Sequence, residues 1–386
     1  MIKIAMPEIK KIEALAQSLK AISFAQAAVR VGGVNQDIKK YVQTILDTDK
    51  ADYYQSVIGL LSLREKIAEK LSLKHATTLT AENIIISHGS VGAFASLCAA
   101  LLETGDEVII PEPTYPTYKN TATFFKAVPV KIPAFVSSVT SSGDLSWELD
   151  IDQIKAATTS KTKMLIFPNP VNPLGFLLSP ALLQELVTWC ESRSIYLVVD
   201  EVYDDYIFEG VFNSITPYVP SSKYVIRLGS FSKNFAMSGW RVGYAVVPTY
   251  LIPILMAVQD VLLCCPNVPG QYAALYALDH HESIAESYAL VSKSRDIVLQ
   301  MLEPFKKQGI FTYAQPAAGF CIFLKTDRKD ATDLALDILN TSLVALVPGK
   351  DFGDNGSAYL RLCYARFPEV TQEGMQRLAQ YFKVTE

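Results

Sequence analysis

The sequence has no apolar run long enough to cross a lipid bilayer. Its longest, VGAFASLCAALL at residues 91–102, is much shorter than the roughly 20 residues that a membrane helix needs. The N-terminal stretch, residues 1–22, has charged residues throughout and no apolar core of the kind that marks a secretory signal. We therefore expect a soluble, cytoplasmic protein with no membrane partner.

Blocks of like charge are also missing. The chain carries 35 Lys and Arg residues and 39 Asp and Glu residues, a formal net charge of −4, and these residues are dispersed along the sequence. A nucleic-acid-binding protein would concentrate basic residues in a patch or stripe. Nucleic acid is therefore disfavoured as a partner.

Cysteine and histidine are too scattered for a disulfide framework or a metal site. The six cysteines include no C-x-x-C motif, and the four histidines have no partners at ligand spacing. We expect buried, reduced thiols and no bound metal. A G-x-G-x-x-G motif after a first strand is missing as well, which disfavours a nicotinamide-dependent dehydrogenase.

Short apolar segments alternate with helical segments from about residue 80 to residue 250. The apolar segments, such as NIIIS, EVIIP, KMLIFP and IYLVV, do not alternate with polar residues. Strands of this kind are typical of a mostly parallel sheet that is covered by helices on both faces. Ser179 and Pro180 mark the start of one covering helix, as N-cap and first-turn residues.

After about residue 285, long helical stretches flank a few short strands, a texture typical of an α+β unit. Apolar residues spaced three or four apart between Ile9 and Ile22 predict an amphipathic helix at the N-terminus. We therefore predict an α/β fold with two domains. The large domain comprises residues 38–284, and the small α+β domain comprises residues 1–37 and 285–386.

Several polar residues follow predicted strands, where α/β proteins bind ligands. The motif SHGS places the backbone N–H groups of Ser90 and Val91 at a helix N-terminus, which favours an anion. Asp200 ends an apolar strand, where a carboxylate needs a cationic or donating partner. Tyr115 and Tyr118 lie in the proline-rich loop PEPTYPTY, which could present an aromatic face to a planar ring. Taken singly, each has a structural explanation as a turn, an N-cap or packing.

The segment GSFSKNFAMSGWRVGY, residues 229–244, adds Lys233 among serines and Arg241 between two glycines. A lysine can form an imine, and an arginine with serine hydroxyls and a helix N-terminus can bind a phosphate. With an aspartate for a pyridinium nitrogen and an aromatic ring for stacking, these groups make up a site for pyridoxal 5′-phosphate (PLP).

On these motifs the sequence resembles the class I/II PLP-dependent aminotransferases, the aspartate-aminotransferase-like proteins of fold type I. Eight blocks occur in the family's order: YYQSVIGLLSLREKIAEKL, SHGSVGAF, PEPTYPTY, PNPVNPLG, VVDEVYDDY, SFSKNFAMSGWRVGY, LVPGKDFG and YLRLCYA. The resemblance covers nearly the whole chain. It implies a seven-stranded, mostly parallel sheet in the large domain and a homodimer that acts in amino-acid metabolism.

The resemblance implies a role for each residue that matches a family motif. Lys233 would form the Schiff base and move the proton, and Arg241 and the protonated ring would favour its neutral amine form. Asp200 would keep the ring nitrogen protonated, and Tyr203 would donate to the phenolic oxygen. The two glycines that flank Arg241 would let the backbone pass close to the phosphate. The remaining cofactor contacts would come from Ser90, Val91, Tyr115, Asn172, Ser230, Ser232, Arg241 and Tyr54 of the partner subunit.

The substrate would be held by Arg361, whose fork of donors suits an α-carboxylate, with Asn172 and Ala27 beside it. Family members commonly have glycine at the position of Ala27 and proline at that of Val29, so the cover over the substrate differs here. Val91 stands where one bacterial subgroup of aspartate enzymes has a lysine for the distal carboxylate. The segment at residues 262–275, whose counterpart often lines the side-chain pocket, is uncharged.

We therefore expect a PLP-dependent aminotransferase with a ping-pong mechanism that alternates between aldimine and pyridoxamine forms. A neutral or apolar L-amino acid is favoured over a dicarboxylic one as donor, with a 2-oxo acid as acceptor. The alternative is a PLP-dependent β- or γ-elimination lyase, or an amino-acid oxidase or synthase, because all of these share the fold and the first steps. A non-catalytic regulator is disfavoured, since Lys233, Asp200, Arg241 and Arg361 are all present.

Overall fold

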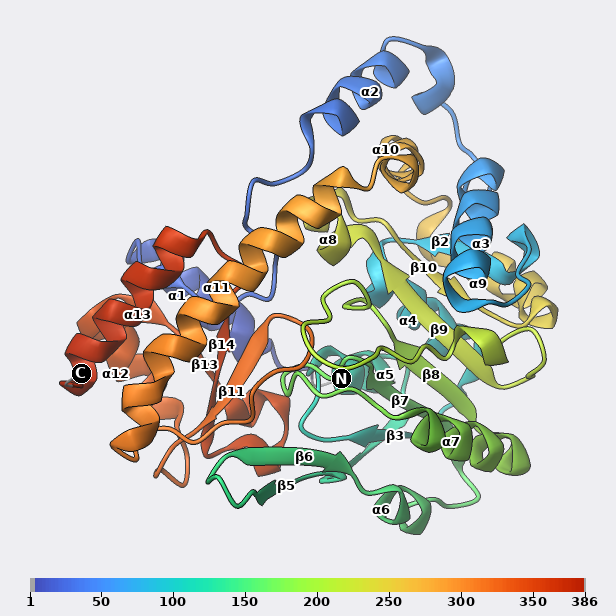
Figure 1. Ribbon diagram of the computed structural model, residues 1–386. Helices are drawn as coiled ribbons and strands as arrows, with labels where there is room; N and C mark the ends of the chain where they lie inside the picture. Colours follow the sequence, from blue (N-terminus) through green and yellow to red (C-terminus); the bar gives the residue numbers. More distant parts are fainter. Residues whose placement is uncertain (1–3, 385–386) are drawn as a thin grey trace.

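A seven-stranded sheet organises the larger part of the computed structural model, which describes residues 4–384 (Figure 1). The strand order is β2–β10–β9–β8–β7–β3–β4. Strand β10 is antiparallel to both of its neighbours, and every other pair is parallel, which confirms the mostly parallel sheet. The strands are β2 Ile84–Ser87, β3 Glu107–Pro111, β4 Val128–Ile132, β7 Thr162–Pro168, β8 Tyr196–Asp200, β9 Val225–Ser230 and β10 Gly243–Val246.

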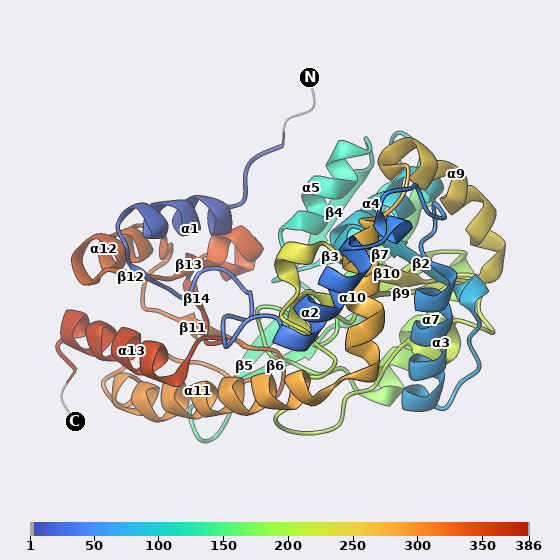
Figure 2. The ribbon, with the colours of Figure 1, turned by 90° about the horizontal axis from the view of Figure 1, so that it is seen from above.

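Both faces of this sheet are buried, which explains why its strands are apolar without alternation. Leu197 and Val199 of β8 join one apolar cluster, whereas Val198 between them joins another. The helices that contribute to these two clusters lie on opposite sides of the sheet (Figure 2). One side is covered by α4 Gly89–Leu101, α5 Thr117–Phe124 and α9 Ile252–Leu263. The other is covered by α3 Leu61–His75, α7 Pro180–Arg193 and α10 Val268–Asp279, with α2 Gln36–Leu46 packed on α10.

A smaller sheet, with the order β11–β14–β13, lies beside the large one. The N-terminal segment joins this part, because β1 pairs in parallel with β12 and α1 lies against β12 and β13 (Figure 2). The division into domains at residues 38 and 285 stays a prediction. The strands are β1 Ile22–Ser23, β11 Cys321–Lys325, β12 Val344–Ala345, β13 Val347–Pro348 and β14 Tyr359–Cys363, and the helices are α1 Glu8–Ser18, α11 Glu282–Lys307, α12 Thr332–Ser342 and α13 Pro368–Phe382.

The predicted start of α7 is confirmed, because the Ser179 hydroxyl accepts a hydrogen bond from the Leu182 N–H at 3.2 Å. Sequence patterns did not predict the antiparallel hairpin of β5 Phe135–Val139 and β6 Leu145–Leu149, nor α6 Ile151–Ala156 after it. None of the helices in residues 4–384 combines the length and the apolar character that crossing a membrane requires.

The strand ends that carry the candidate residues meet at one edge of the large sheet. Gly243, the first residue of β10, lies opposite Ser87 at the end of β2 and opposite Ser230 at the end of β9. Asp200, at the end of β8, pairs with Pro168 at the end of β7. This alignment brings the segments that follow four strands to a common place.

Candidate active site

A cavity of about 610 Å³ opens at this edge of the sheet. Residues of the smaller part, including Ala27 and Arg361, line it together with residues of the large sheet. It brings together nearly all of the predicted site residues, namely Ala27, Ser90, Val91, Tyr115, Asn172, Asp200, Tyr203, Ser230, Ser232, Lys233, Arg241 and Arg361. Tyr54 does not line the cavity; its side chain is 84% exposed.

Lys233 lies on α8, the single turn Phe231–Asn234 that follows β9, and Ser230 caps this turn by accepting from the Ser232 N–H. The Lys233 ammonium donates to the Ala27 carbonyl and lies 5.6 Å from the centre of the Tyr203 ring. Burial lowers the pKa of Lys233 to about 8, and the charge of Arg361 acts in the same direction. The sequence had suggested Arg241 and the protonated cofactor ring as causes; in this structure burial and Arg361 lower the pKa, and the effect of the ring stays a prediction.

Asp200 is buried, and burial raises the pKa of its carboxyl to about 6. The Tyr118 hydroxyl donates to Asp200 Oδ2 at 2.8 Å and holds that pKa down. Oδ1 has no hydrogen-bond partner within the described residues. A buried acceptor of this kind needs a donor. Sequence reasoning placed Tyr118 in the motif PEPTYPTY but did not predict this contact with Asp200.

A cradle for an anion forms where the N-terminus of α4 meets Arg241. The guanidinium donates to the Ser238 carbonyl at 2.7 Å and to the His88 carbonyl at 3.2 Å, which holds it beside the first turn of α4. A Cβ atom on Gly243 would lie 2.5 Å from the Ser90 nitrogen, so β10 approaches this turn as closely as glycine permits. A Cβ on Gly239 would meet nothing within 4 Å. Gly239 lines the cavity, so the predicted approach of the two glycines to a phosphate stays a prediction.

Arg361, in β14, has no exposed surface. It donates to Asn172 Oδ1 at 3.4 Å and to the Ala25 carbonyl, and its Nε atom has no partner within the described residues. Asn172 also donates to the Tyr203 hydroxyl at 3.5 Å, so Asn172 links Arg361 to Tyr203. Arg361 is thus a fixed cation with a free donor in the cavity wall, as the binding of a carboxylate requires.

Arg366 holds the segment that carries Ala27, a contact that sequence reasoning missed. Its guanidinium donates to the carbonyls of Ser23, Gln26 and Ala28, each at 2.8 Å. The backbone at Ala27 lies outside the left-handed region, so alanine replaces the family's glycine without strain. No residue of the segment 262–275 lines the cavity formed by this chain.

Comparisons with known proteins agree with this geometry. Residues 21–382 match the family model "Aminotransferase class I and II". An aspartate aminotransferase of Pyrococcus abyssi is 30% identical over 385 residues, which cover 97% of this chain and 95% of that one. Among solved structures, Thermus thermophilus aspartate aminotransferase with maleate has a TM-score of 0.87 at 25% identity, covering 98% of this chain and 97% of that one. An aromatic aminotransferase from Pyrococcus horikoshii has a TM-score of 0.84 at 28% identity, covering 97% of this chain and all of the other.

The close approach of β10 to α4 gives a testable prediction. The Gly243→Ala substitution should push the first turn of α4 away from Arg241 and weaken the binding of PLP at least about tenfold. Gly309→Ala is the control, because it adds the same methyl group at an exposed turn outside the cavity. PLP affinity is measured by titration of the apo protein followed by absorption. Equal affinities of the two variants would contradict the cradle.

The Tyr118–Asp200 hydrogen bond predicts a pH effect. Tyr118→Phe removes a donor that favours the ionised carboxylate, so the pKa of Asp200 should rise above about 6. Carboxyl ¹³C NMR of the apo protein measures that pKa. Tyr115→Phe serves as the control, since Tyr115 contacts the Tyr118 ring without bonding to Asp200. An unchanged pKa in Tyr118→Phe would show that the hydroxyl has no influence.

Proposed function

Because this chain belongs to the class I and II aminotransferases, we propose that it uses PLP to move the amino group of a neutral or apolar L-amino acid to a 2-oxo acid. The enzyme class follows from the family. The cofactor, the residue roles and the substrate class are the proposal.

The observation that carries the proposal is the convergence of three complementary groups in one cavity. Lys233 offers a buried amine whose pKa is lowered to about 8, so its neutral form is far more populated near neutral pH than that of an ordinary lysine. Asp200 offers an unpartnered buried oxygen for a ring N–H. Arg241 and the N-terminus of α4 offer a cradle for a phosphate. These groups match the aldehyde, the ring nitrogen and the phosphate of PLP.

PLP, when bound, supplies an electron sink for the charge that develops at the substrate's α-carbon. Lys233 Nζ would take the α-proton and return it, and burial brings the pKa of its amine closer to neutral pH, where a general base works best. Asp200 would hold a proton on the ring nitrogen through Oδ1. Arg361 would orient the substrate through its α-carboxylate, with Asn172 fixing the guanidinium from the side. Tyr115, Tyr203, Ser230 and Ser232 would complete the contacts.

The proposed substrate class rests on the wall of the cavity. Val91 lines the cavity with a side chain that is 37% exposed, so an apolar surface meets the ligand there. Lys10 also lines the cavity and is exposed. Its positive charge would favour an acidic substrate. Relatives are named for aspartate and for aromatic amino acids. The test therefore has to include acidic, aromatic and aliphatic amino acids.

We also propose that the active unit is a homodimer. Tyr53 and Tyr54 are 67% and 84% exposed in the single chain, more than large aromatic side chains usually are in a protein that stays alone. Tyr54 of the partner subunit would then reach the phosphate, as the family resemblance implies.

The central experiment follows the absorption of the purified protein while single L-amino acids are added without a 2-oxo acid. We expect a yellow band from the lysine-bound cofactor that bleaches with apolar donors, as the amino group is transferred to PLP. Lys233→Ala should bind PLP without this band and turn over at least about 10⁴-fold more slowly. A persistent band with release of ammonia or peroxide would instead indicate the lyase or the oxidase. Normal turnover by Lys233→Ala would refute the assignment.

Arg361 gives a second prediction. Arg361→Lys keeps the charge but loses the fork of donors, so the KM for the amino donor should rise about tenfold to a hundredfold. Steady-state kinetics measure this change. Arg377→Lys on α13, whose partner is Glu373, provides a control with the same chemical change outside the cavity. If both variants had the wild-type KM, Arg361 would not bind the carboxylate.

A further inference from the structure

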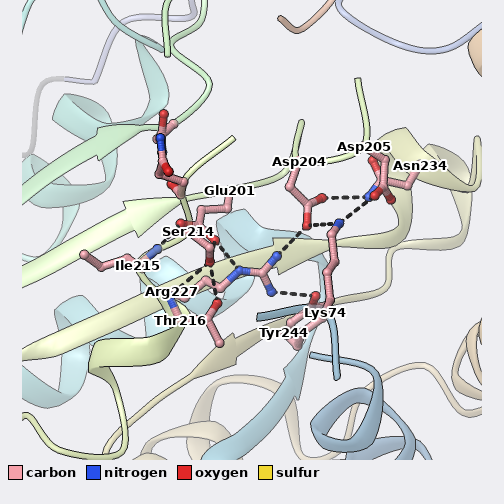
Figure 3. A network of polar contacts seen from close by, with 12 residues as sticks. Lys74, Glu201, Asp204, Asp205, Ser214, Ile215, Thr216, Arg227, Asn234 and Tyr244 are labelled. Atoms are coloured by element: carbon pink, nitrogen blue, oxygen red, sulfur yellow. Dashed lines mark hydrogen bonds and ion pairs between the residues drawn. The ribbon is translucent and has the colours of Figure 1, made fainter. Parts of the chain in front are cut away.

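A cluster of buried charges lies behind the candidate site, on the opposite face of the large sheet. Side chains alternate along β8, so Asp200 shares the face of Val198, whereas Glu201 shares the face of Val199. Arg227 of β9 pairs with Val199 and lies on that second face. Figure 3 shows Arg227 between two carboxylates there.

Every nitrogen of the Arg227 guanidinium has a partner. Nε donates to Glu201 at 2.6 Å, Nη1 to the Tyr244 hydroxyl at 2.8 Å, and Nη2 to Asp204 Oδ2 at 2.8 Å. Lys74 of α3 donates to the same Asp204 oxygen at 3.0 Å. The cluster therefore joins β9, β10, α3 and the segment after β8, and two cations fix the position of the Asp204 carboxylate.

The second oxygen of that carboxylate reaches the lysine-bearing turn. Asn234 Nδ2 donates to Asp204 Oδ1 at 2.9 Å, and Asn234 directly follows Lys233 in α8 (Figure 3). Asn234 is 8% exposed, and its own Oδ1 has no partner within the described residues. A buried amide with an unpaired oxygen costs free energy, whereas an apolar residue would avoid that cost. The hydrogen bond to Asp204 is what an asparagine side chain provides at this position and an apolar side chain would not.

The turn itself has little intrinsic stability, because α8 comprises four residues and a helix of one turn does not persist alone. Ser230 caps its start, and the Tyr206 hydroxyl donates to the Lys233 carbonyl at 3.4 Å, a long hydrogen bond. Asn234 holds its end to a carboxylate that Arg227 and Lys74 have already fixed. The turn that carries Lys233 is thus connected by a side-chain hydrogen bond to the ion cluster on the other side of the sheet.

We propose that Asn234 is a positioning residue, which orients Lys233 toward the cofactor by tying α8 to Asp204. This inference rests on the proposed function, since it takes Lys233 as the residue that binds PLP and moves the proton. It assigns no chemistry to Asn234 itself. Displacement of Lys233 Nζ should slow proton transfer more than it weakens substrate binding.

Asn234→Leu is the main test variant, because it removes the donor while keeping a similar volume. Asn234→Ala is the second variant, in case leucine does not fit. Asn83→Leu is the matched control: it makes the same substitution at a buried amide, 6% exposed, which donates to the Val247 carbonyl next to the start of β2, at the end of that strand away from the cavity. A role confined to stability would make all three variants alike, with lower unfolding temperatures and unchanged chemistry.

Hydrogen exchange of the apo protein tests the link without the cofactor. We expect backbone amides at residues 231–236 to exchange about tenfold faster in Asn234→Leu and Asn234→Ala than in the wild type, and at the wild-type rate in Asn83→Leu. Unchanged exchange in both Asn234 variants would overturn the inference. This result does not depend on PLP, so it stands even if the cofactor assignment fails.

The holoenzyme supplies the second readout. In the Asn234 variants the pH midpoint of the yellow band should move by about half a unit, because the imine nitrogen of Lys233 changes its surroundings. We expect kcat to fall about tenfold and KM to change less than about twofold. A wild-type midpoint together with a wild-type kcat would show that Asn234 only stabilises the fold. Failure of the wild type itself to become yellow with PLP would refute the proposed function instead.

Discussion

The position of β10 between β2 and β9 is the constraint on which the site depends. Because Gly243 lies opposite both Ser87 and Ser230, the start of α4, the turn that carries Lys233 and the loop that carries Arg241 meet at one point. A backbone that passes 2.5 Å from where a Cβ would stand leaves no choice but glycine there. A shift in this register would separate the anion cradle from the lysine, although both would still be present in the sequence.

Burial gives these groups their chemistry. The protein interior lowers the pKa of Lys233 from 10.5 to about 8 and raises that of Asp200 from 3.8 to about 6, so both groups titrate much closer to neutral pH than they would in water. Buried charges need partners, and the structure supplies them from distant segments: Ala25 and Asn172 for Arg361, and Tyr118 for Asp200. The same requirement accounts for the ion cluster around Arg227 behind the sheet.

The two faces of the sheet thus have different roles. One face of the β8 end presents Asp200 to the cavity, and the other presents Glu201 to Arg227. Since β-strands alternate their side chains, neighbouring residues in one motif serve a polar site and a structural cluster at the same time. Asn234 extends this arrangement to the helical turn, where Lys233 lines the cavity and its neighbour contacts Asp204.

The sequence by itself determined the α/β fold, the alternation of strands and helices between about residues 80 and 250, the family, and many of the residues that line the cavity. It could do so because those residues lie in short contiguous motifs at strand ends, where local pattern reports the chemistry. The tertiary structure alone decided the antiparallel insertion of β10, the pKa of Lys233, and the contacts of Tyr118, Arg366 and Asn234. Each of these depends on groups that are tens to hundreds of residues apart, and burial and register bring such groups together only in the folded chain.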